Sequence, residues 1–354
     1  MRVLVAMSGG VDSSTVAGLL HEAGHEVIGA TLLLYDHGSA VGRKGTCCAG
    51  QDIHDAKNVA AHLGIPHYVI DAEERFRQSV IDNFADSYAL GETPVPCVRC
   101  NQSVKFGDLL DLAADLGCEA MATGHYVQRI DGPGGPEMHR AVDPARDQSW
   151  FLFATTRDQL ARSLFPLGAM RTKDEVRAHA ARLGIEVAQK PDSQDICFVP
   201  QGSYADLVAK LRPESAAPGE IVDLAGQVLD THKGVGGYTV GQGKRLGRAS
   251  GLEESRNIVV ALDPTTRRVI VGPRRTGATE VYLRELNWLI DPPREPVAVR
   301  VKLRAREEPQ PASVVATEDG ALVRLEVAAL AAPGQACVFY DGERILGGGF
   351  IRKP

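Results

Sequence analysis

The sequence lacks any long apolar run and any overall excess of positive charge. No segment approaches the roughly 18 apolar residues of a membrane-spanning helix, and no basic start with an apolar core precedes the first hydrophobic segment, Met1–Met7. Lysine and arginine number 39 against 45 acidic residues, a net charge of −6 that argues against coating nucleic acid by bulk charge. We therefore expect a cytoplasmic protein without a membrane partner, whose seven cysteines meet a reducing environment.

Positive charge nevertheless gathers in one part of the chain. Between Lys233 and Arg306 there are 15 lysines and arginines against 7 acidic residues, a local excess of eight positive charges. Two interpretations stay open, a solvated arginine-rich face and a surface that binds a polyanion.

The pattern of apolar residues changes along the 354-residue chain. As far as about Val199, short apolar runs alternate with amphipathic stretches, which predicts an α/β domain with a doubly wound parallel sheet. After Ala216–Gly219, short alternating segments predict a small central domain and a C-terminal antiparallel β-barrel. We place the three domains at residues 1–205, 206–275 and 276–354. The expected strands of the first domain are Arg2–Met7, Val27–Leu34, His67–Asp71 and Cys118–Thr123, and its helices are Ser13–Ala23, Asp52–Leu63, Glu73–Leu90 and Ser103–Leu116.

A glycine-rich string, Met7-Ser-Gly-Gly-Val-Asp-Ser-Ser14, follows the first strand and opens the first helix. Adjacent glycines let the backbone approach a ligand closely, and the N–H groups of the following helix then bind an anion. The sequence has neither GxxxxGK[ST] nor GxGxxG, which excludes a Walker-type loop and a dinucleotide fingerprint. We expect a phosphate site here, with Asp12 as a candidate Mg²⁺ ligand.

Three cysteines lie outside the apolar pattern. Cys97, Cys100 and Cys197 stand beside polar and turn-forming residues, whereas Cys118 and Cys337 are typical of small buried hydrophobic residues. Reactive thiols need an accessible, electropositive setting that lowers their pKa. We expect such a setting from three basic residues close in sequence, Arg99, Lys105 and Lys190.

These motifs resemble those of a known family. The glycine-rich string is similar to the PP-loop of the ATP pyrophosphatases, and over essentially its whole length the chain resembles the tRNA-specific 2-thiouridylases of the MnmA/TrmU type. The resemblance is carried by Ala6–Ser14, Thr93–Phe106, Ala122–Tyr126, Asp147–Leu152, Leu164–Gly168, Asp192–Phe198, Tyr238–Gln242, Pro333–Gln335, Val338–Tyr340 and Leu346–Gly349.

The resemblance implies a tRNA-uridine 2-sulfurtransferase that uses ATP and Mg²⁺ to thiolate the wobble uridine of tRNA anticodons. Adenylation of the uridine C2 oxygen makes it a good leaving group, and a sulfur nucleophile then adds at C2. Cys197 matches the cysteine that receives sulfur as a persulfide from a cysteine desulfurase or sulfur-relay protein. Cys100 matches the partner nucleophile, which releases sulfide or closes a transient Cys100–Cys197 disulfide.

The resemblance also implies two sets of contact residues. Those matching ATP contacts are Ala6, Met7, Ser8, Gly9, Gly10, Val11, Asp12, Ser13, Leu32 and Gly124. Those matching tRNA contacts are Val95, Pro96, Cys97, Arg146, Asp147, Gln148, Arg304 and Ala305.

One departure from the family keeps the mechanism open. The family commonly has Asn-Pro-Asp where this sequence has Val95-Pro96-Cys97, which creates a CxxC motif with Cys100. With Cys197, three thiolates suffice to hold a [4Fe–4S] cluster with one open iron, while zinc is a ligand short. Persulfide, cluster, zinc and a purely structural CxxC are therefore all considered.

Two other functions each account for part of the sequence. A PP-loop ligase acting on a small metabolite explains the glycine-rich string but not Cys100 and Cys197. An RNA-binding barrel on a degenerate nucleotide fold explains the arginine-rich segment but requires no thiols.

Overall fold

The computed structural model describes residues 1–35, 48–190, 196–199, 203–251, 256–274 and 277–353. The chain divides into two compact units, each built from more than one segment. The first contains residues 1–79, 97–198 and 343–345, and the second contains residues 80–96, 199–342 and 346–354.

The first unit is built around a parallel five-stranded sheet with the order β3-β2-β1-β4-β7. Its strands are β1 (Arg2–Ala6), β2 (Glu26–Leu33), β3 (His67–Asp71), β4 (Ala120–Ala122) and β7 (Ser163–Leu164). In register, Val3 of β1 lies opposite Val27 of β2 and Ala120 of β4. The apolar runs of the sequence form buried central strands, as predicted.

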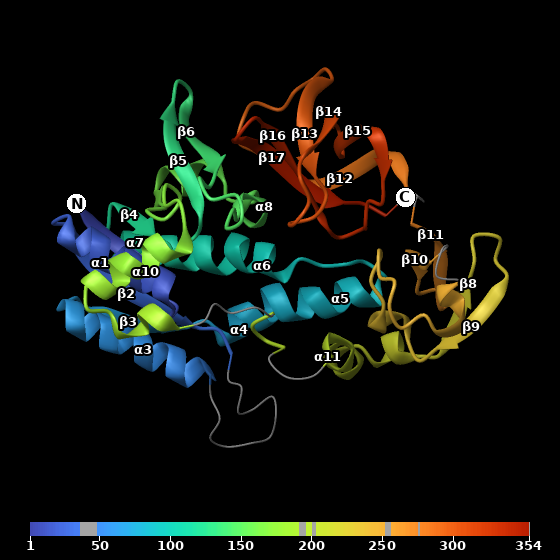
Figure 1. Cartoon of the computed structure of the whole chain (residues 1–354), viewed down its shortest axis with the longest axis horizontal. Helices are drawn as coiled ribbons and strands as arrows, with labels where there is room; N and C mark the ends of the chain where they lie inside the picture. Colours follow the sequence, from blue (N-terminus) through green and yellow to red (C-terminus); the bar gives the residue numbers. More distant parts are fainter. Residues whose placement is uncertain (36–47, 191–195, 200–202, 252–255, 275–276, 354) are drawn as a thin grey trace. The chain divides into compact units, whose positions relative to one another are not determined.

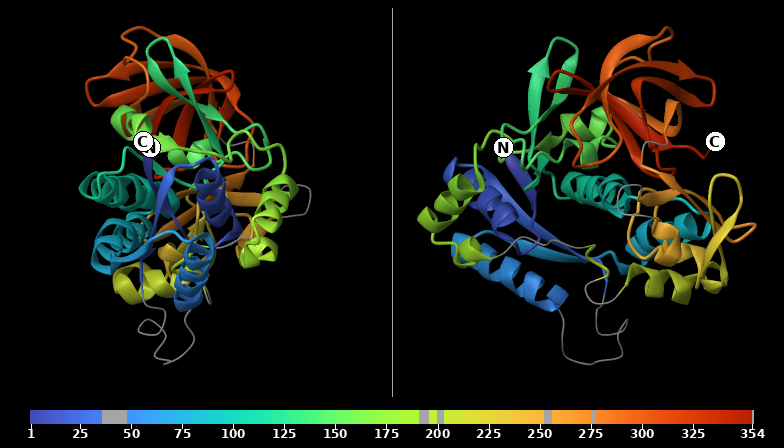
Figure 2. Two further views of the ribbon diagram at one scale, coloured as in Figure 1. Left: turned by 90° about the vertical axis from the view of Figure 1, so that its left-hand side faces the viewer. Right: turned by 45° about the vertical axis from the view of Figure 1, so that its right-hand side comes forward.

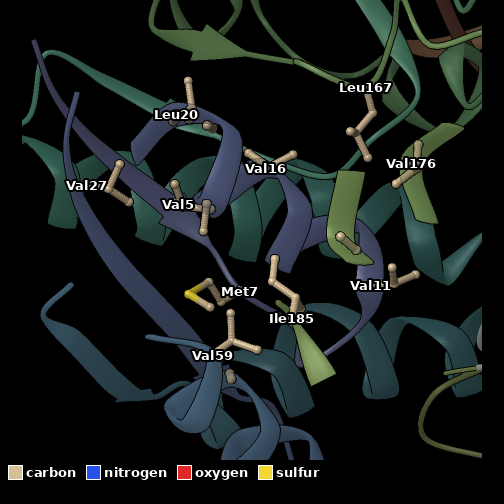
Figure 3. Close-up of a cluster of buried hydrophobic side chains, with 14 of the residues drawn as sticks. Val5, Met7, Val11, Val16, Leu20, Val27, Val59, Leu167, Val176 and Ile185 are labelled. Carbon is tan, nitrogen blue, oxygen red and sulfur yellow. The ribbon is translucent and has the colours of Figure 1, made fainter. Parts of the chain in front are cut away.

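Helices cover both faces of this sheet, as predicted for a doubly wound fold (Figure 1). Alternate residues of a strand point to opposite faces, so Val3 and Val5 of β1 pack on one side and Leu4 on the other. The first face carries α1 (Val11–Glu22), α3 (Cys48–Leu63) and α10 (Lys173–Arg182), and α7 (Leu109–Asp115) packs on β1 and β4. Figure 3 shows the apolar cluster of the first face, including Met7, Val16, Val59 and Val176.

The helical stretch that carries the CxxC motif is not a uniform α-helix. It comprises α6 (Pro96–Arg99), a π-helical segment (Cys100–Asp108) and α7. A second interrupted helix runs through α4 (Glu73–Phe76), a π-helical segment (Arg77–Asp82) and α5 (Asn83–Ala89). π-Helical turns are rare and frequently mark functional sites, and here one of them begins at Cys100.

The segment between β4 and β7 also holds a hairpin that was not predicted. Its strands are β5 (Val127–Gly132) and β6 (Gly135–Arg140), paired in antiparallel register from Val127–Arg140 to Gly132–Gly135. The remaining helices of this unit are α8 (Ser149–Leu152), α9 (Arg157–Ala161) and the short 3₁₀ turn Glu186–Gln189.

The second unit contains a small central sheet with the strand order β10-β11-β8-β9. Its strands are β8 (Gly219–Val222), β9 (Val228–His232), β10 (Asn257–Asp263) and β11 (Arg268–Pro273), preceded by α11 (Tyr204–Leu211). Strands β10 and β11 form an antiparallel hairpin around Asp263–Thr266. Short 3₁₀ turns lie at Pro213–Ala216, Val235–Gly237 and Gly247–Ser250.

Six antiparallel strands close into a C-terminal barrel, drawn in orange to red in Figures 1 and 2. They are β12 (Ala278–Trp288), β13 (Val297–Lys302), β14 (Gln310–Thr317), β15 (Gly320–Ala329), β16 (Ala336–Asp341) and β17 (Arg344–Ile351). Pairing of β12 with both β15 and β17 closes the barrel. Cys337 is fully buried in its core, and Cys118 is buried in the first unit, as predicted for both.

Residues 80–96 pack within the second unit although they precede it in sequence. Glu92 is buried, and its carboxylate accepts two hydrogen bonds from Arg284, at 2.9 and 2.7 Å. The Thr93 N–H donates to the Pro333 carbonyl at 2.7 Å, and Gln335 Nε2 donates to the Thr93 carbonyl at 3.0 Å. The chain that leads into Pro96 is thereby fixed to the second unit.

Within the described residues, none of the helices combines the length and the apolar character needed to cross a lipid bilayer.

Candidate active site

The glycine-rich string forms a loop between β1 and α1 that is fixed by its own serines. The Ser8 N–H donates to Ser13 Oγ at 3.0 Å, and Ser13 Oγ donates to the Gly10 carbonyl at 3.3 Å. Gly10 is the N-cap of α1 and has no side chain to accept from the first-turn amides. Those amides and the positive end of the helix dipole are therefore suited to an anion.

Gly9 brings this loop against α3 more closely than any other residue type could. Its φ is +74°, and a Cβ at this position would lie 2.1 Å from the Asp52 carbonyl oxygen. Lys190 holds the same contact from the other side, since its Nζ donates to the Gly9 carbonyl at 3.1 Å, to Asp52 at 2.7 Å and to Asp55 at 2.6 Å. The loop geometry thus depends on a glycine and on a lysine 181 residues away.

The residues predicted to contact ATP lie at the carboxyl ends of neighbouring strands. Ala6 is the last residue of β1, Leu32 is the last but one of β2, and Gly124 follows β4. The strand order reverses between β1 and β4, and ligands of open α/β sheets bind at such a reversal. A Cβ at Gly124 would lie 2.9 Å from the Ser13 nitrogen, so the segment after β4 touches the loop directly.

The carboxylate of Asp12, the second residue of α1, is occupied by groups of this chain. Lys173 Nζ lies 2.8 Å from each carboxylate oxygen, and Tyr126 Oη donates to Oδ1 at 2.6 Å. Lys173 and Tyr126 are both buried. The prediction that Asp12 holds Mg²⁺ is not favoured by this geometry, because a metal ion would have to displace the Lys173 ammonium group.

The three cysteines singled out by the sequence lie in the first unit and influence one another. Cys97 is on α6, Cys100 begins the π-helical segment, and Cys197 lies in a turn whose carbonyl accepts a hydrogen bond from Tyr35 Oη. All three are free thiols. The preceding part of that cysteine motif, residues 192–195, lies outside the described residues.

The prediction of acidic thiols is wrong. Desolvation raises the pKa of Cys97, Cys100 and Cys197, for Cys197 to about 12 with further contributions from the charges of Cys100 and Cys97. The side chain of Cys100 is buried, whereas those of Cys97 and Cys197 are exposed. Lys105 opposes this rise by lowering the pKa of Cys100, for which it was predicted, and also of Cys97 and Cys197. Lys190 instead binds the glycine-rich loop, and Arg99 Nη1 donates to Gln102 at 3.3 Å.

His125 connects the loop to the neighbourhood of the thiols. It follows Gly124, its Nδ1 lies 2.9 Å from Thr123 Oγ1, and its ring is 6.1 Å from that of Phe106 on the π-helical segment. Burial and the charge of Lys105 lower the pKa of His125 well below its usual value, so the imidazole is neutral. One lysine therefore acts electrostatically on this histidine and on all three thiols.

The predicted tRNA contacts near Asp147 form a turn before α8. Ser149 donates to the Asp147 carboxylate through its N–H at 3.1 Å and its hydroxyl at 2.9 Å, and Arg140 Nε donates at 3.2 Å. The Asp147 side chain is 1% exposed. Gln148 Oε1 accepts from the Tyr126 N–H at 3.0 Å. Asp147 therefore shapes the turn, and a tRNA contact here remains a prediction for Arg146 and Gln148.

The other predicted tRNA contacts lie in both units. Val95 is buried, Pro96 begins α6, and Arg304 and Ala305 follow β13. Arg304 Nη1 lies 3.4 Å from Glu307, whereas its buried Nη2 has no hydrogen-bond partner among the described residues. Arg304 lines a hollow of about 250 Å³ together with Gly241, Ile258, Arg274, Glu307, Ala329 and Leu330.

Reasoning from the sequence missed Lys173 as a member of this site. Its partner Asp12 is 161 residues away, which no local pattern reveals. One local signal was present, however, because Thr172-Lys173 reads as an N-cap followed by a lysine at the positive end of a helix. A cation at that position is unfavourable unless a partner neutralises it.

Family models cover most of the chain. A tRNA methyl transferase HUP domain matches residues 1–201, a tRNA methyl transferase PRC-barrel domain matches residues 205–273, and an aminomethyltransferase beta-barrel domain matches residues 278–351. The fold and the loop thus define a nucleotide-binding protein of the PP-loop class.

Curated relatives narrow this class. The tRNA-specific 2-thiouridylase MnmA of Acidiphilium cryptum is 68% identical over 99% of this chain and 100% of its own length. That of Gluconobacter oxydans is 63% identical over 99% of both chains. Among solved structures, a 4-thiouridine synthetase in complex with RNA and bound ATP is 16% identical with a TM-score of 0.38, covering 60% of this chain and 50% of that one. The chain belongs to the tRNA-specific 2-thiouridylase MnmA family.

Replacement of Gly9 tests the loop geometry. Gly9→Ala should destabilise the protein by about 1–3 kcal/mol from backbone strain alone, and further through the contact with Asp52. Gly10→Ala is the matched control, since its Cβ would meet only Ser8 Oγ at 3.5 Å. Urea denaturation measures both, and equal stability of the two variants would contradict the close approach at Gly9.

Replacement of Lys105 tests the electrostatics of the thiols. Because their pKa is raised, alkylation by iodoacetamide should be slow at pH 7 and accelerate as the pH rises and thiolate forms. Lys105→Met should raise the pKa further and slow alkylation of Cys197 several-fold at pH 8, followed by mass spectrometry. Lys57→Met serves as control, because Lys57 acts on His67. Unchanged alkylation of Cys197 in Lys105→Met would refute the assigned role of Lys105.

Proposed function

We propose that this chain is an ATP-dependent tRNA sulfurtransferase that converts the wobble uridine to 2-thiouridine in the cytoplasm. The observation that carries the proposal is the presence, in one compact unit, of a phosphate-binding loop at the strand reversal and three thiols that influence one another electrostatically. The family relatives named above are tRNA-specific 2-thiouridylases, which supports tRNA as the substrate.

The glycine-rich loop supplies the activation step. The uridine C2 oxygen attacks the α-phosphorus of ATP, pyrophosphate leaves, and the oxygen becomes part of an AMP leaving group. Serine hydroxyls and first-turn amides of α1 are placed to bind the phosphates. We expect Mg²⁺ to accompany ATP, and we assign it no ligand in the loop because Lys173 holds both Asp12 oxygens.

The thiols supply the sulfur-transfer step. A cysteine desulfurase or sulfur-relay protein delivers sulfur to Cys197 as a persulfide, whose terminal sulfur attacks C2 while AMP leaves with the C2 oxygen. The Cys100 thiolate then attacks the Sγ of Cys197, the sulfur–sulfur bond breaks, and the thiocarbonyl is released with a Cys100–Cys197 disulfide. An external thiol reductant restores both cysteines. Lys105 favours the thiolates that this step needs.

An iron–sulfur cluster on Cys97, Cys100 and Cys197 is the alternative source of sulfur. In the described part of the chain, no group of three histidine, cysteine or acidic side chains is arranged to hold a metal ion. This argues against a single ion such as zinc at these thiols, and we derive no step through a cluster. Persulfide chemistry is the route that we propose.

Replacement of single cysteines tests the sulfur-transfer step. Cys100→Ser and Cys197→Ser should each abolish 2-thiouridine formation from tRNA, ATP and a persulfide donor, measured by mass spectrometry of digested tRNA. Cys118→Ser, at a buried thiol near β4, is the control that keeps activity.

The same assay distinguishes the alternatives. Retained activity in both Cys100→Ser and Cys197→Ser would reject the proposed mechanism. Protein purified without oxygen should be active without iron, and activity that follows the iron content would favour the cluster instead.

The salt dependence of tRNA binding tests the arginine-rich segment. Each phosphate contact adds about 0.9 to the negative slope of log affinity against log salt for a duplex. Arg304→Ala should weaken tRNA binding and reduce that slope by about one, because the Arg304 side chain lies in the arginine-rich segment and is 39% exposed. Arg212→Ala should leave the slope unchanged, since Asp86 already binds Arg212 at 2.6 Å. Equal slopes for Arg304→Ala and the unaltered chain would place the contact elsewhere.

A further inference from the structure

The Lys173 ammonium group is the part of the nucleotide site that the loop motif does not explain. Lys173 Nζ is 2.8 Å from both oxygens of Asp12 and 5.8 Å from the centroid of the Tyr126 ring. Tyr126 Oη donates to Asp12 Oδ1 at 2.6 Å. The three residues come from α10, α1 and the segment after β4, so the loop carboxylate is fixed from two sides.

Lys173 occupies an unfavourable position in its own helix. It is the first residue of α10, after the N-cap Thr172, whose Oγ1 accepts from the Glu175 N–H at 3.2 Å. A cation at a helix N-terminus opposes the helix dipole, and burial of an ammonium group costs further free energy. Asp12 offsets both costs. The placement therefore indicates a role at the loop rather than in α10.

Asp12 needs a cation for a complementary reason. As the second residue of α1, its negative charge is stabilised by the same helix N-terminus that has to bind phosphate. A free carboxylate there would compete with the phosphates and repel them. With Lys173 on both oxygens, this charge is neutralised and the amides of the loop serve the nucleotide.

We propose that Lys173 is a positioning residue whose ammonium group, rather than a divalent cation, neutralises Asp12 and so allows the loop to bind a polyphosphate. The proposal rests on the nucleotide site of the proposed function and names its charge-balancing residue. A metal ion does not fit this role. If it were bound to the Asp12 oxygens, it would be repelled by the Lys173 ammonium group, which lies 2.8 Å from both oxygens.

Binding of inorganic pyrophosphate without metal tests the proposal. Titration calorimetry in EDTA should show about tenfold weaker binding for Lys173→Met, because the free Asp12 charge repels the ligand. Asp12→Asn should bind at least as tightly as the unaltered chain. The double variant Asp12→Asn/Lys173→Met should bind about as tightly as the unaltered chain, because no carboxylate charge is left to neutralise, and it tests the proposal even where Lys173→Met alone fails to fold. Lys210→Met, at an exposed lysine of α11, should change nothing.

Two results would overturn the proposal. Equal weakening by Asp12→Asn and Lys173→Met would show that the pair only shapes the loop. Loss of the Mg²⁺-induced gain in ATP affinity in Asp12→Asn would make Asp12 a metal ligand, whereas we expect that gain to persist. Absence of pyrophosphate binding by the unaltered chain would reject the nucleotide site itself. The binding experiment contains no tRNA and no sulfur donor. Its result therefore does not depend on sulfur transfer, which the thiolation assay tests separately.

Discussion

The parallel pairing of β1 with β2 on one side and β4 on the other is the constraint from which the site follows. Successive crossovers first build the sheet outward from β1 to β3, then return to the opposite edge of β1. The loop after β1 therefore lies beside the segment after β4, where Gly124 approaches Ser13. Two lysines then fix the loop, the partly exposed Lys190 through the Gly9 carbonyl and the buried Lys173 through Asp12. The conformation of the loop is thus largely set by residues of the chain itself.

Desolvation outweighs charge in the pKa of the three thiols. It is the largest cause that raises the pKa of Cys97, Cys100 and Cys197, and Lys105 compensates only in part. Protonated thiols exchange slowly with disulfides, although the side chains of Cys97 and Cys197 are exposed. The neutral His125 lies under the same lysine, which makes Lys105 a common electrostatic control for residues near the loop and near the thiols.

Patterns within short segments of the sequence predicted many of the strands, helices and motifs. They did not predict interactions between residues that are distant in sequence. The strand His67–Asp71 and the loop Met7–Ser14 were predicted because period and motif are local. The C-terminal barrel was predicted only as a class, and the register shift after Arg284, with Glu285 at a φ of +52°, is not visible in the pattern of apolar residues. Acidic thiols were predicted from neighbouring lysines, whereas burial is a tertiary property. The contact of Asp12 with Lys173 was not predicted for the same reason, because the two residues are 161 positions apart.

The attachment of residues 80–96 to the second unit has a consequence for how the chain is divided. Glu92 and Thr93 are bound by Arg284, Pro333 and Gln335, all of which lie far beyond residue 205. A fragment ending there would leave the buried Glu92 carboxylate without its guanidinium partner. Tyr204, whose ring stacks on that of Tyr88, would lie one residue from the new end. A cut at residue 205 therefore removes the residues that bind the segment leading to Cys97 and Cys100.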